Sequence, residues 1–460
     1  MMGQQKRTGH EAIQSMTSGS PIRLITSFML PLLLGNLFQQ AYNMADGMIV
    51  GQILGADALA AVGATTSVQF LTLGLCIGSC AGFAIPVAQS FGAGQEGKLR
   101  SCVYHAGVLS AALAVLMTLI TAIFCSRIVT LMQTPAEIYR DAYRYLLIIF
   151  LGIPFNILYN LTASILRAVG NSRAPFLFLA LSTVLNIFLD LFCIAVLGWG
   201  CQGAAIATVA SEALSGLFCL LYIIRRVPQL HIGKADRHWD KKTAGMLIAM
   251  GIPMGLQYSI TAIGSMVMQS ANNSLGSVYV SGFTAGTKLK QLFISPFDAM
   301  ATALATYTGQ NYGAGRMDRV RQGLQEVLRM AVLYGVGAGL GMIFFGRGMA
   351  GWFLSAKNTG ALDAAARYLR CMGYLYWVLA PLNVYRNVCQ ALGFSGRAIF
   401  AGVLEMSARS AVATVFVPLF GYAAICWTDQ SAWVSATIYL FFMCRHVMRR
   451  REQELAQQKG

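Results

Sequence analysis

Six acidic residues stand inside long apolar stretches of this sequence, and they are the side chains most able to do chemistry. They are Asp46, Asp190 and Glu212 in the first half and Asp298, Glu405 and Asp429 in the second. A charge in hydrocarbon is costly unless it is paired or solvated, so each acid is a candidate functional group. Enzyme chemistry is not indicated: the sequence has no HExxH motif, and Leu99 stands where a phosphate-binding loop needs Ser or Thr.

Four oxygen-bearing side chains of the first half predict an ion site. Asp46, Asp190 and Thr208 all fall roughly 9–12 Å below the same membrane face, at 1.5 Å per helical residue. Asn186 precedes Asp190 by one helical turn and shares its face. Such hard oxygen ligands suit Na⁺ or a proton and not a soft metal. The alternative is a set of hydrogen bonds that only hold helices together. Two acids at one level repel each other, which argues against a purely structural role.

The composition predicts that these residues lie in an all-α integral membrane protein. Of 460 residues, 56% are hydrophobic and 11% are charged, whereas a soluble domain has about 25% charged residues. Continuous apolar runs argue against an outer-membrane barrel, whose strands alternate. At about 20 residues per span, the sequence predicts twelve transmembrane helices. Their expected ranges are 24–54, 58–91, 101–125, 142–166, 174–197, 202–225, 244–270, 279–309, 323–346, 364–389, 398–419 and 422–447.

An internal repeat divides these spans into two halves. Gln89-Ser-Phe-Gly-Ala-Gly94 recurs as Gln310-Asn-Tyr-Gly-Ala-Gly315, Ala168-Val-Gly170 recurs as Ala391-Leu-Gly393, and Pro31 recurs as Pro253. With six spans in each half, both copies have the same orientation. We therefore expect two six-helix bundles related by a pseudo-two-fold axis along the membrane normal, with a transport site between or within them.

Charge sets the expected orientation. The net charge is +16, and most Lys and Arg residues fall in short segments on the side of both termini, which predicts a multi-pass protein of the cell (inner or cytoplasmic) membrane with both termini in the cytoplasm. Nucleic acid is not an expected partner. The expected division is a tail over 1–22, a first bundle over 23–226, a linker over 227–243, a second bundle over 244–447 and a tail over 448–460.

The second half offers weaker candidates. Tyr258, Met266, Met268 and Lys288 could line a substrate cavity, although an aromatic and methionine stripe is more often ordinary packing and Lys288 could extend toward the membrane surface. Glu405 and Arg409 are one turn apart and are expected to neutralise each other.

In these features the sequence resembles the multidrug and toxic compound extrusion (MATE) family, and Gly251-Ile-Pro-Met-Gly-Leu-Gln257 is similar to its MepA-like branch. The motifs that carry the resemblance are Asp46-Gly-Met-Ile-Val-Gly51, the two Gln-x-x-Gly-Ala-Gly turns, Arg167-Ala-Val-Gly170, Asn186-Ile-Phe-Leu-Asp190 and Gly203-Ala-Ala-Ile-Ala-Thr208. The resemblance implies a cation-coupled exporter of amphipathic, often cationic, compounds. It also implies a cation site at Asp46, Asn186, Asp190 and Thr208. Some relatives use a second-half glutamate instead, where this chain has Thr261.

Together these features predict a secondary active multidrug exporter that works by alternating access and antiport with H⁺ or Na⁺. We expect small amphipathic molecules and the lipid bilayer as its partners, no cofactor beyond the coupling ion, and a monomer. Two alternatives remain: a flippase for lipid-linked sugar or polysaccharide precursors, and a non-transporting membrane scaffold or receptor.

Overall fold

The computed structural model describes residues 13–355 and 357–459, and its regular structure is helical throughout that part of the chain. The first half comprises α1 (Pro21–Ile53), α2 (Ala56–Gly92), α3 (Glu96–Leu131), α4 (Ala136–Leu151), α5 (Ile153–Ala168), α6 (Arg173–Leu191) and α7 (Cys201–Arg226). The second half comprises α8 (Lys241–Asn273), α9 (Ser277–Gly313), α10 (Met317–Ala350), α11 (Thr359–Tyr374), α12 (Leu379–Ala391), α13 (Ser395–Ala411), α14 (Val417–Phe420) and α15 (Tyr422–Lys459).

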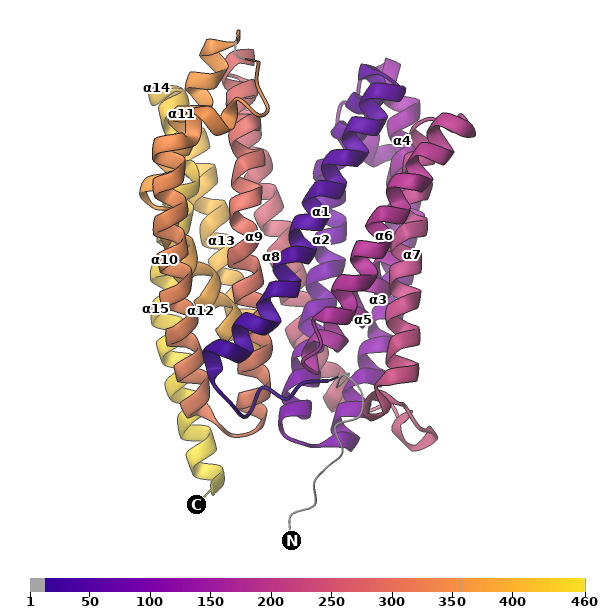
Figure 1. Ribbon diagram of the computed structural model, residues 1–460, viewed down its shortest axis with the longest axis vertical. Coiled ribbons are helices and arrows are strands. Elements are labelled where there is room, and N and C mark those ends of the chain that lie inside the picture. The colour runs from indigo at the N-terminus through magenta and orange to yellow at the C-terminus, as the bar shows by residue number, and fades with distance from the viewer. Residues whose placement is uncertain (1–12, 356, 460) are drawn as a thin grey trace.

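These elements form twelve rods in two bundles, as the sequence predicts. We call α1–α7 the N-terminal bundle and α8–α15 the C-terminal bundle. Figure 1 shows the two bundles side by side, meeting at the end where α15 finishes and spreading apart toward α4 and α14. We call the first the seam end and the other the far end. Eight of the described helices are long and apolar enough to cross a membrane on their own, and the α4–α5 pair makes a ninth candidate.

Local breaks divide some rods into two elements. The rod of α4 and α5 bends by 45° at Gly152, and a 3₁₀ turn at Tyr376–Val378 separates α11 from α12. Short π-helical turns at Phe192–Val196 and Val412–Phe416 end the equivalent helices α6 and α13. Gly200 and Gly421 follow these turns with φ of 60° and 58°, a backbone conformation that glycine adopts without the penalty other residues incur. The two halves thus share their irregularities as well as their spans.

The bundles exchange contacts through two equivalent helices. α1 packs on α6 of its own half and on α9 of the other, whereas α8 packs on α13 of its own half and on α2 of the other. The α2–α8 crossing is close because glycines face each other: a Cβ at Gly82 would lie 2.5 Å from the Cα of Gly251. Figure 1 shows α1 running obliquely from the C-terminal bundle near the seam end to the N-terminal bundle at the far end.

The segment between the bundles is folded onto the N-terminal one. The backbone N–H of Asp240 donates to Nε2 of His105 at 2.9 Å, and the Asp240 carboxylate caps α8 by accepting from the backbone N–H groups of Lys242 and Thr243. α8 begins inside the predicted linker, and the predicted C-terminal tail continues α15. Residues 1–12 of the predicted N-terminal tail lie outside the described residues. The division into bundles and tails at the expected residues stays a prediction.

Candidate functional site

An acidic cluster inside the N-terminal bundle contains the predicted ion-site residues. α1 contributes Asp46, and α6 contributes Asn186 and Asp190 from adjacent turns of one face. The carboxyl groups of Asp46 and Asp190 lie close enough to interact directly. Asn186 and Asp190 are 1% and 0% exposed. The structure therefore brings the two acids of the prediction together, with the asparagine in the turn next to them.

Tyrosines surround the two acids. The hydroxyl of Tyr42, one turn before Asp46 on α1, lies 2.9 Å from the Thr208 hydroxyl. Both Tyr42 and the buried Tyr145 interact electrostatically with Asp46. Thr208 thus joins the cluster through Tyr42. The sequence gives no motif that marks these two tyrosines, and their place beside the acids follows only from how the helices pack.

The polar atoms of this cluster are unusual because they lack partners. Within the described part of the chain, Oδ1 of Asp46, both carboxylate oxygens of Asp190 and both side-chain polar atoms of Asn186 are buried without a hydrogen-bond partner. Buried polar groups in proteins are nearly always satisfied, and exceptions call for an ion, water or function. Among the described residues, no group of three or more His, Cys, Asp and Glu side chains is placed to hold a metal. The cluster can therefore offer two carboxylates and neutral oxygens to a proton or a hard cation.

Two buried acids of the C-terminal bundle, Asp429 and Glu405, are in contrast neutralised by basic side chains. Asp429 on α15 accepts from Lys290 Nζ at 2.8 Å, from Arg409 Nε at 3.1 Å and from the Tyr368 hydroxyl at 2.9 Å. These contacts are buried, and they use positive charge from both α9 and α13. The Asp429 carboxylate is not free to bind an ion in the same way, because its oxygens already accept hydrogen bonds from protein donors.

Glu405 extends this network. It forms a close ion pair with Arg386 on α12, and its other oxygen lies 3.6 Å from Arg409. The expected Glu405–Arg409 pair is therefore present, but each residue has a nearer partner on another helix. The two bundles thus differ: these two acids of the C-terminal bundle are paired, whereas acid oxygens of the N-terminal cluster are not.

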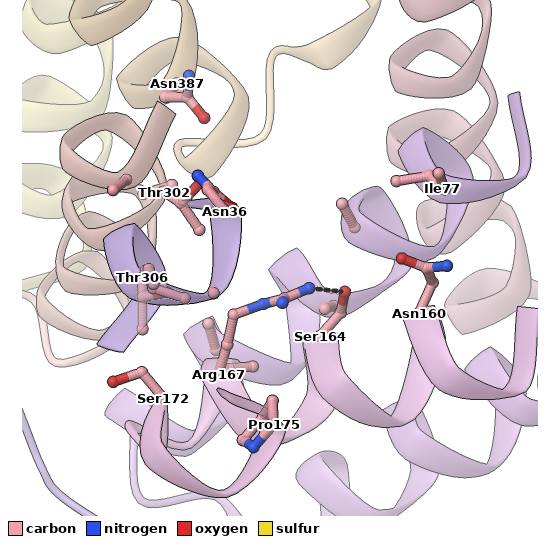
Figure 2. A pocket seen from close by; sticks show the side chains of 18 of the residues that line it. Asn36, Ile77, Asn160, Ser164, Arg167, Ser172, Pro175, Thr302, Thr306 and Asn387 are labelled. Atoms are coloured by element: carbon pink, nitrogen blue, oxygen red, sulfur yellow. Dashed lines mark hydrogen bonds between the residues drawn. The ribbon is translucent and has the colours of Figure 1, made fainter. Parts of the chain in front are cut away.

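A cavity of about 280 Å³ lies between the bundles, toward the seam end. Its lining comes from α1, α2, α5, α6, α8, α9 and α12, and Figure 2 shows the polar side chains that point into it. Equivalent residues of the two repeats line it together, so it lies on the pseudo-two-fold axis. These pairs include Ser164 and Asn387, Arg167 and Gln390, and Ala168 and Ala391. On α1 the cavity reaches Gln39, one turn from Tyr42 of the acidic cluster.

One of the four proposed cavity residues lines this cavity. Tyr258 is part of its wall, whereas Met266, Met268 and Lys288 are not. Met268 is 3% exposed in the core of the C-terminal bundle, and Nζ of Lys288 lies 5.6 Å from the centre of the Phe353 ring. Helical spacing placed Met266 and Met268 in the right span but could not say which face of α8 meets the cavity.

Comparison with known proteins gives the family. The family model described as MatE matches residues 31–192 and again residues 253–415, so its two copies coincide with the repeat. The chain belongs to the MatE family. Members of this family are transporters and not enzymes. The twelve-helix, two-bundle fold is also that of an outward-facing MATE family multidrug resistance transporter, with a TM-score of 0.89, 22% identity and coverage of 97% of this chain and 100% of that one.

Several relatives of this MatE protein carry functional names. The chain is 28% identical to the probable multidrug resistance protein YpnP of Bacillus subtilis, covering 82% of this chain and 84% of the relative. It is 26% identical to a FAD transporter of Shewanella oneidensis, covering 80% and 82%. The multidrug export protein MepA of Staphylococcus aureus is 20% identical, covering 89% and 90%. The resemblance to the MATE family and its MepA-like branch is thus confirmed, as is a multi-pass membrane protein.

The repeated Gln-x-x-Gly-Ala-Gly turns of this MatE protein meet across the seam end. Nε2 of Gln89 donates to the carbonyl of Ala391 at 2.8 Å, and Nε2 of Gln310 donates to the carbonyl of Ala168 at 2.9 Å. These are equivalent bonds of the two repeats, each crossing from one bundle to the other. We call them the seam bonds. Both motifs are evident in the sequence, but a motif at the end of a helix does not reveal which residue it contacts.

Glycine permits this approach of the two bundles. A Cβ at Gly92 would lie 1.9 Å from the carbonyl oxygen of Gln310, and a Cβ at Gly313 would lie 1.9 Å from that of Gln89. No side chain fits at such distances, and the obstructing atoms are backbone. The first Gly of each repeated Gly-Ala-Gly is therefore required for the bundles to touch here.

Residues 14–17 cross the same seam before α1 begins. The N–H of Gln14 donates to the carbonyl of Val169 in the N-terminal bundle at 3.3 Å. Two residues later, the N–H of Met16 donates to Oε1 of Gln310 at 2.8 Å, and its carbonyl accepts from Asn311 at 3.1 Å. Met16 is 1% exposed. This segment is thus bonded to both bundles.

Proposed function

We propose that this MATE-family protein is a multidrug efflux transporter that exports amphipathic small molecules by antiport with H⁺ or Na⁺. The coupling ion binds among Asp46, Asn186, Asp190 and Thr208, and the cargo enters the cavity between the bundles. Relatives named as multidrug resistance and multidrug export proteins support the cargo class. The observation that carries the ion site is the set of orphaned acid oxygens in the N-terminal bundle, against the ion-paired acids Asp429 and Glu405 in the C-terminal one.

The proposed coupling runs through α1. This helix carries Asp46 in the cluster, Gln39 and Pro31 in the cavity wall, and it contacts α9 of the other bundle. Pro31 lacks a backbone donor, so α1 can bend there at low cost. Ion binding removes the repulsion between Asp46 and Asp190, repacks α1 and changes the cavity, after which the bundles rock and expose the ion to the other face. An ion entering across 100 mV supplies about 2.3 kcal/mol per charge.

Three further features belong to the proposal. The seam end faces the cytoplasm, consistent with the basic residues near it, which follow the positive-inside pattern. The protein works as a monomer, because the two bundles of a single chain hold a complete acidic cluster and a complete cavity. The cargo is amphipathic; the expected preference for cations finds no support in the cavity wall, where the charged residue among the described lining residues is Arg167.

The test is dye efflux from proteoliposomes with the pH and Na⁺ gradients imposed separately. Wild-type protein is expected to move dye with one gradient or both, and Asp46→Asn and Asp190→Asn are each expected to abolish the gradient-driven part. The matched control is Asp57→Asn, because Asp57 is an exposed acid at the start of α2. Full gradient-driven transport by both cluster variants would exclude the ion site. No flux under any gradient, with lipid-linked sugar translocated instead, would favour the flippase alternative.

A further inference from the structure

Arg167 gives the cavity between the bundles a positive charge that nothing described there neutralises. It projects from the last turn of α5, and Figure 2 shows its guanidinium group extending across the cavity wall toward Ser164. Its Nη2 donates to the Ser164 hydroxyl at 2.8 Å. Among the described lining residues there is no acid. A guanidinium has further donors in a rigid planar fork, which fit the paired oxygens of a carboxylate or phosphate.

The repeat shows that the fold does not require a charge at this position. The equivalent residue of the second half is Gln390, which also lines the cavity and donates to Oε1 of Gln257 at 2.7 Å. A neutral amide therefore satisfies the same helical position in the same architecture. Arg167 adds a charge to one wall of a nearly symmetric cavity, and that charge is the most specific chemical feature of the site.

The other polar lining groups are neutral. Ser172, Thr302 and Thr306 bring hydroxyl groups to the same wall region, and Asn36 and Asn387 bring amides. The nearest acid along α9 is Asp298, one turn beyond Thr302 and outside the lining, where it interacts electrostatically with Arg386. The cavity wall is thus able to donate several hydrogen bonds beside one cation and offers no carboxylate to a cationic ligand.

Size limits what the cavity holds. Its volume of about 280 Å³ lies at the lower end of the roughly 300–1,000 Å³ found for small-molecule sites. A polar group with part of an attached ring or chain fits, while the remainder of a larger molecule extends along the seam. Pro31, Ile85 and Phe176 provide apolar wall beside the polar residues.

We propose that this cavity binds the carboxylate or phosphate group of an anionic amphiphile, and that Arg167 is the residue that selects for it. The inference rests on the proposed transport function and specifies its substrate class. Ser164 positions the guanidinium. The hydroxyl groups of Ser172, Thr302 and Thr306 complete the hydrogen bonding of the anion, and the apolar part of the substrate packs on α1 and α2.

The experiment measures equilibrium binding to the purified full-length protein by fluorescence anisotropy. Two xanthene dyes of similar size and opposite charge serve as probes: carboxyfluorescein, which is anionic, and rhodamine 6G, which is cationic. We expect tighter binding of carboxyfluorescein, and a loss of about tenfold or more in its affinity in Arg167→Gln, which installs the residue of the second repeat. Arg167→Lys is expected to lose less, because it keeps the charge but not the fork.

The matched control is Arg173→Gln, because Arg173 is an exposed arginine at the start of α6 outside the cavity lining. It is expected to leave both affinities unchanged. Equal binding of carboxyfluorescein by wild type, Arg167→Gln and Arg167→Lys would overturn the proposal, as would preferential binding of rhodamine 6G that does not change in the Arg167 variants.

A second arm identifies the source of the anionic group. Binding is repeated in nanodiscs of phosphatidylcholine and in nanodiscs containing phosphatidylglycerol. If wild-type protein binds carboxyfluorescein less tightly in the phosphatidylglycerol nanodiscs, and Arg167→Gln shows no such difference between nanodiscs, the ligand is a lipid phosphate. If dye binding by wild-type protein is the same in both nanodiscs, the ligand is a soluble carboxylate. Because no gradient is applied, failure of ion coupling in proteoliposomes would refute the transport proposal and leave this result standing.

Discussion

Asp429 in the C-terminal bundle is ion-paired, whereas Asp190 in the N-terminal bundle is not, and a matched pair of substitutions measures what this difference contributes to folding stability. Asp429→Asn removes the charge that receives Lys290 at 2.8 Å and Arg409 at 3.1 Å. Breaking a buried ion pair by removing one partner costs roughly 3–5 kcal/mol, because the remaining charge stays buried. Asp190→Asn removes a carboxylate that accepts no hydrogen bond from the described residues and lies close to another acid. We expect no loss of folding stability there, or a gain from reduced repulsion.

Thermal unfolding followed by tryptophan fluorescence gives the assay. α15 carries Trp427 and Trp433 close to Asp429 in the sequence, so the fluorescence signal includes residues of the C-terminal bundle near the substitution. At roughly 2–4 °C per kcal/mol for a unit of about 200 residues, Asp429→Asn is expected to lower the midpoint by about 6–20 °C. Asp190→Asn is expected to match or exceed wild type while losing gradient-driven transport. A fall in midpoint as large for Asp190→Asn as for Asp429→Asn would refute the assignment of Asp190 to ion coupling, since it would make Asp190 a structural acid.

Two further outcomes test the seam end and the linker. Gly92→Ala places a Cβ 1.9 Å from a backbone oxygen, so hydrogen exchange at the ends of α9 and α12 should rise by about fivefold or more; Gly97→Ala, which meets open space, should not change it, and equal exchange in both would contradict the close contact. Asp240 accepts hydrogen bonds from the Thr243 hydroxyl and from the Thr243 and Lys242 backbone, which lower the pKa of its carboxyl from 3.8 to about 2. Its charge therefore stabilises the fold above pH 4 and ceases to do so as the pH falls toward 2. In thermal unfolding across this range, the gap between wild type and Asp240→Asn should close as the pH falls; a constant gap would show that the charge has no role.

Much of the architecture follows from the sequence because hydrocarbon imposes simple rules. The apolar runs give twelve rods, and the spacing of Gln89 and Gln310 gives the repeat that the family match confirms. The meeting of Asp46 and Asp190 also follows, because a helix has a fixed rise per residue and both acids lie at the same depth. Depth is the coordinate that a membrane sequence encodes best.

Rotation about each helix axis and long-range partners are encoded less directly. Met268 lies on α8, one of the helices that line the cavity, but it faces the core of the C-terminal bundle and not the cavity. The one-turn rule finds Glu405 beside Arg409, yet the nearer partner of Arg409 is Asp429, which comes from α15. Arg167 is read from sequence as a loop charge that sets orientation, because only the fold shows that the end of α5 borders a cavity. Such contacts depend on how whole bundles meet.

Residues 14–17 add a consequence for the speed of the transport cycle. Before α2 and α9 can separate at the seam end, this peptide must lose its hydrogen bond to either Val169 or Gln310, because it is bonded to both. This step involves a stretch of chain that belongs neither to the acidic cluster nor to the cavity wall. Substitution of these few residues would therefore change the turnover rate while leaving ion affinity and cargo preference unchanged.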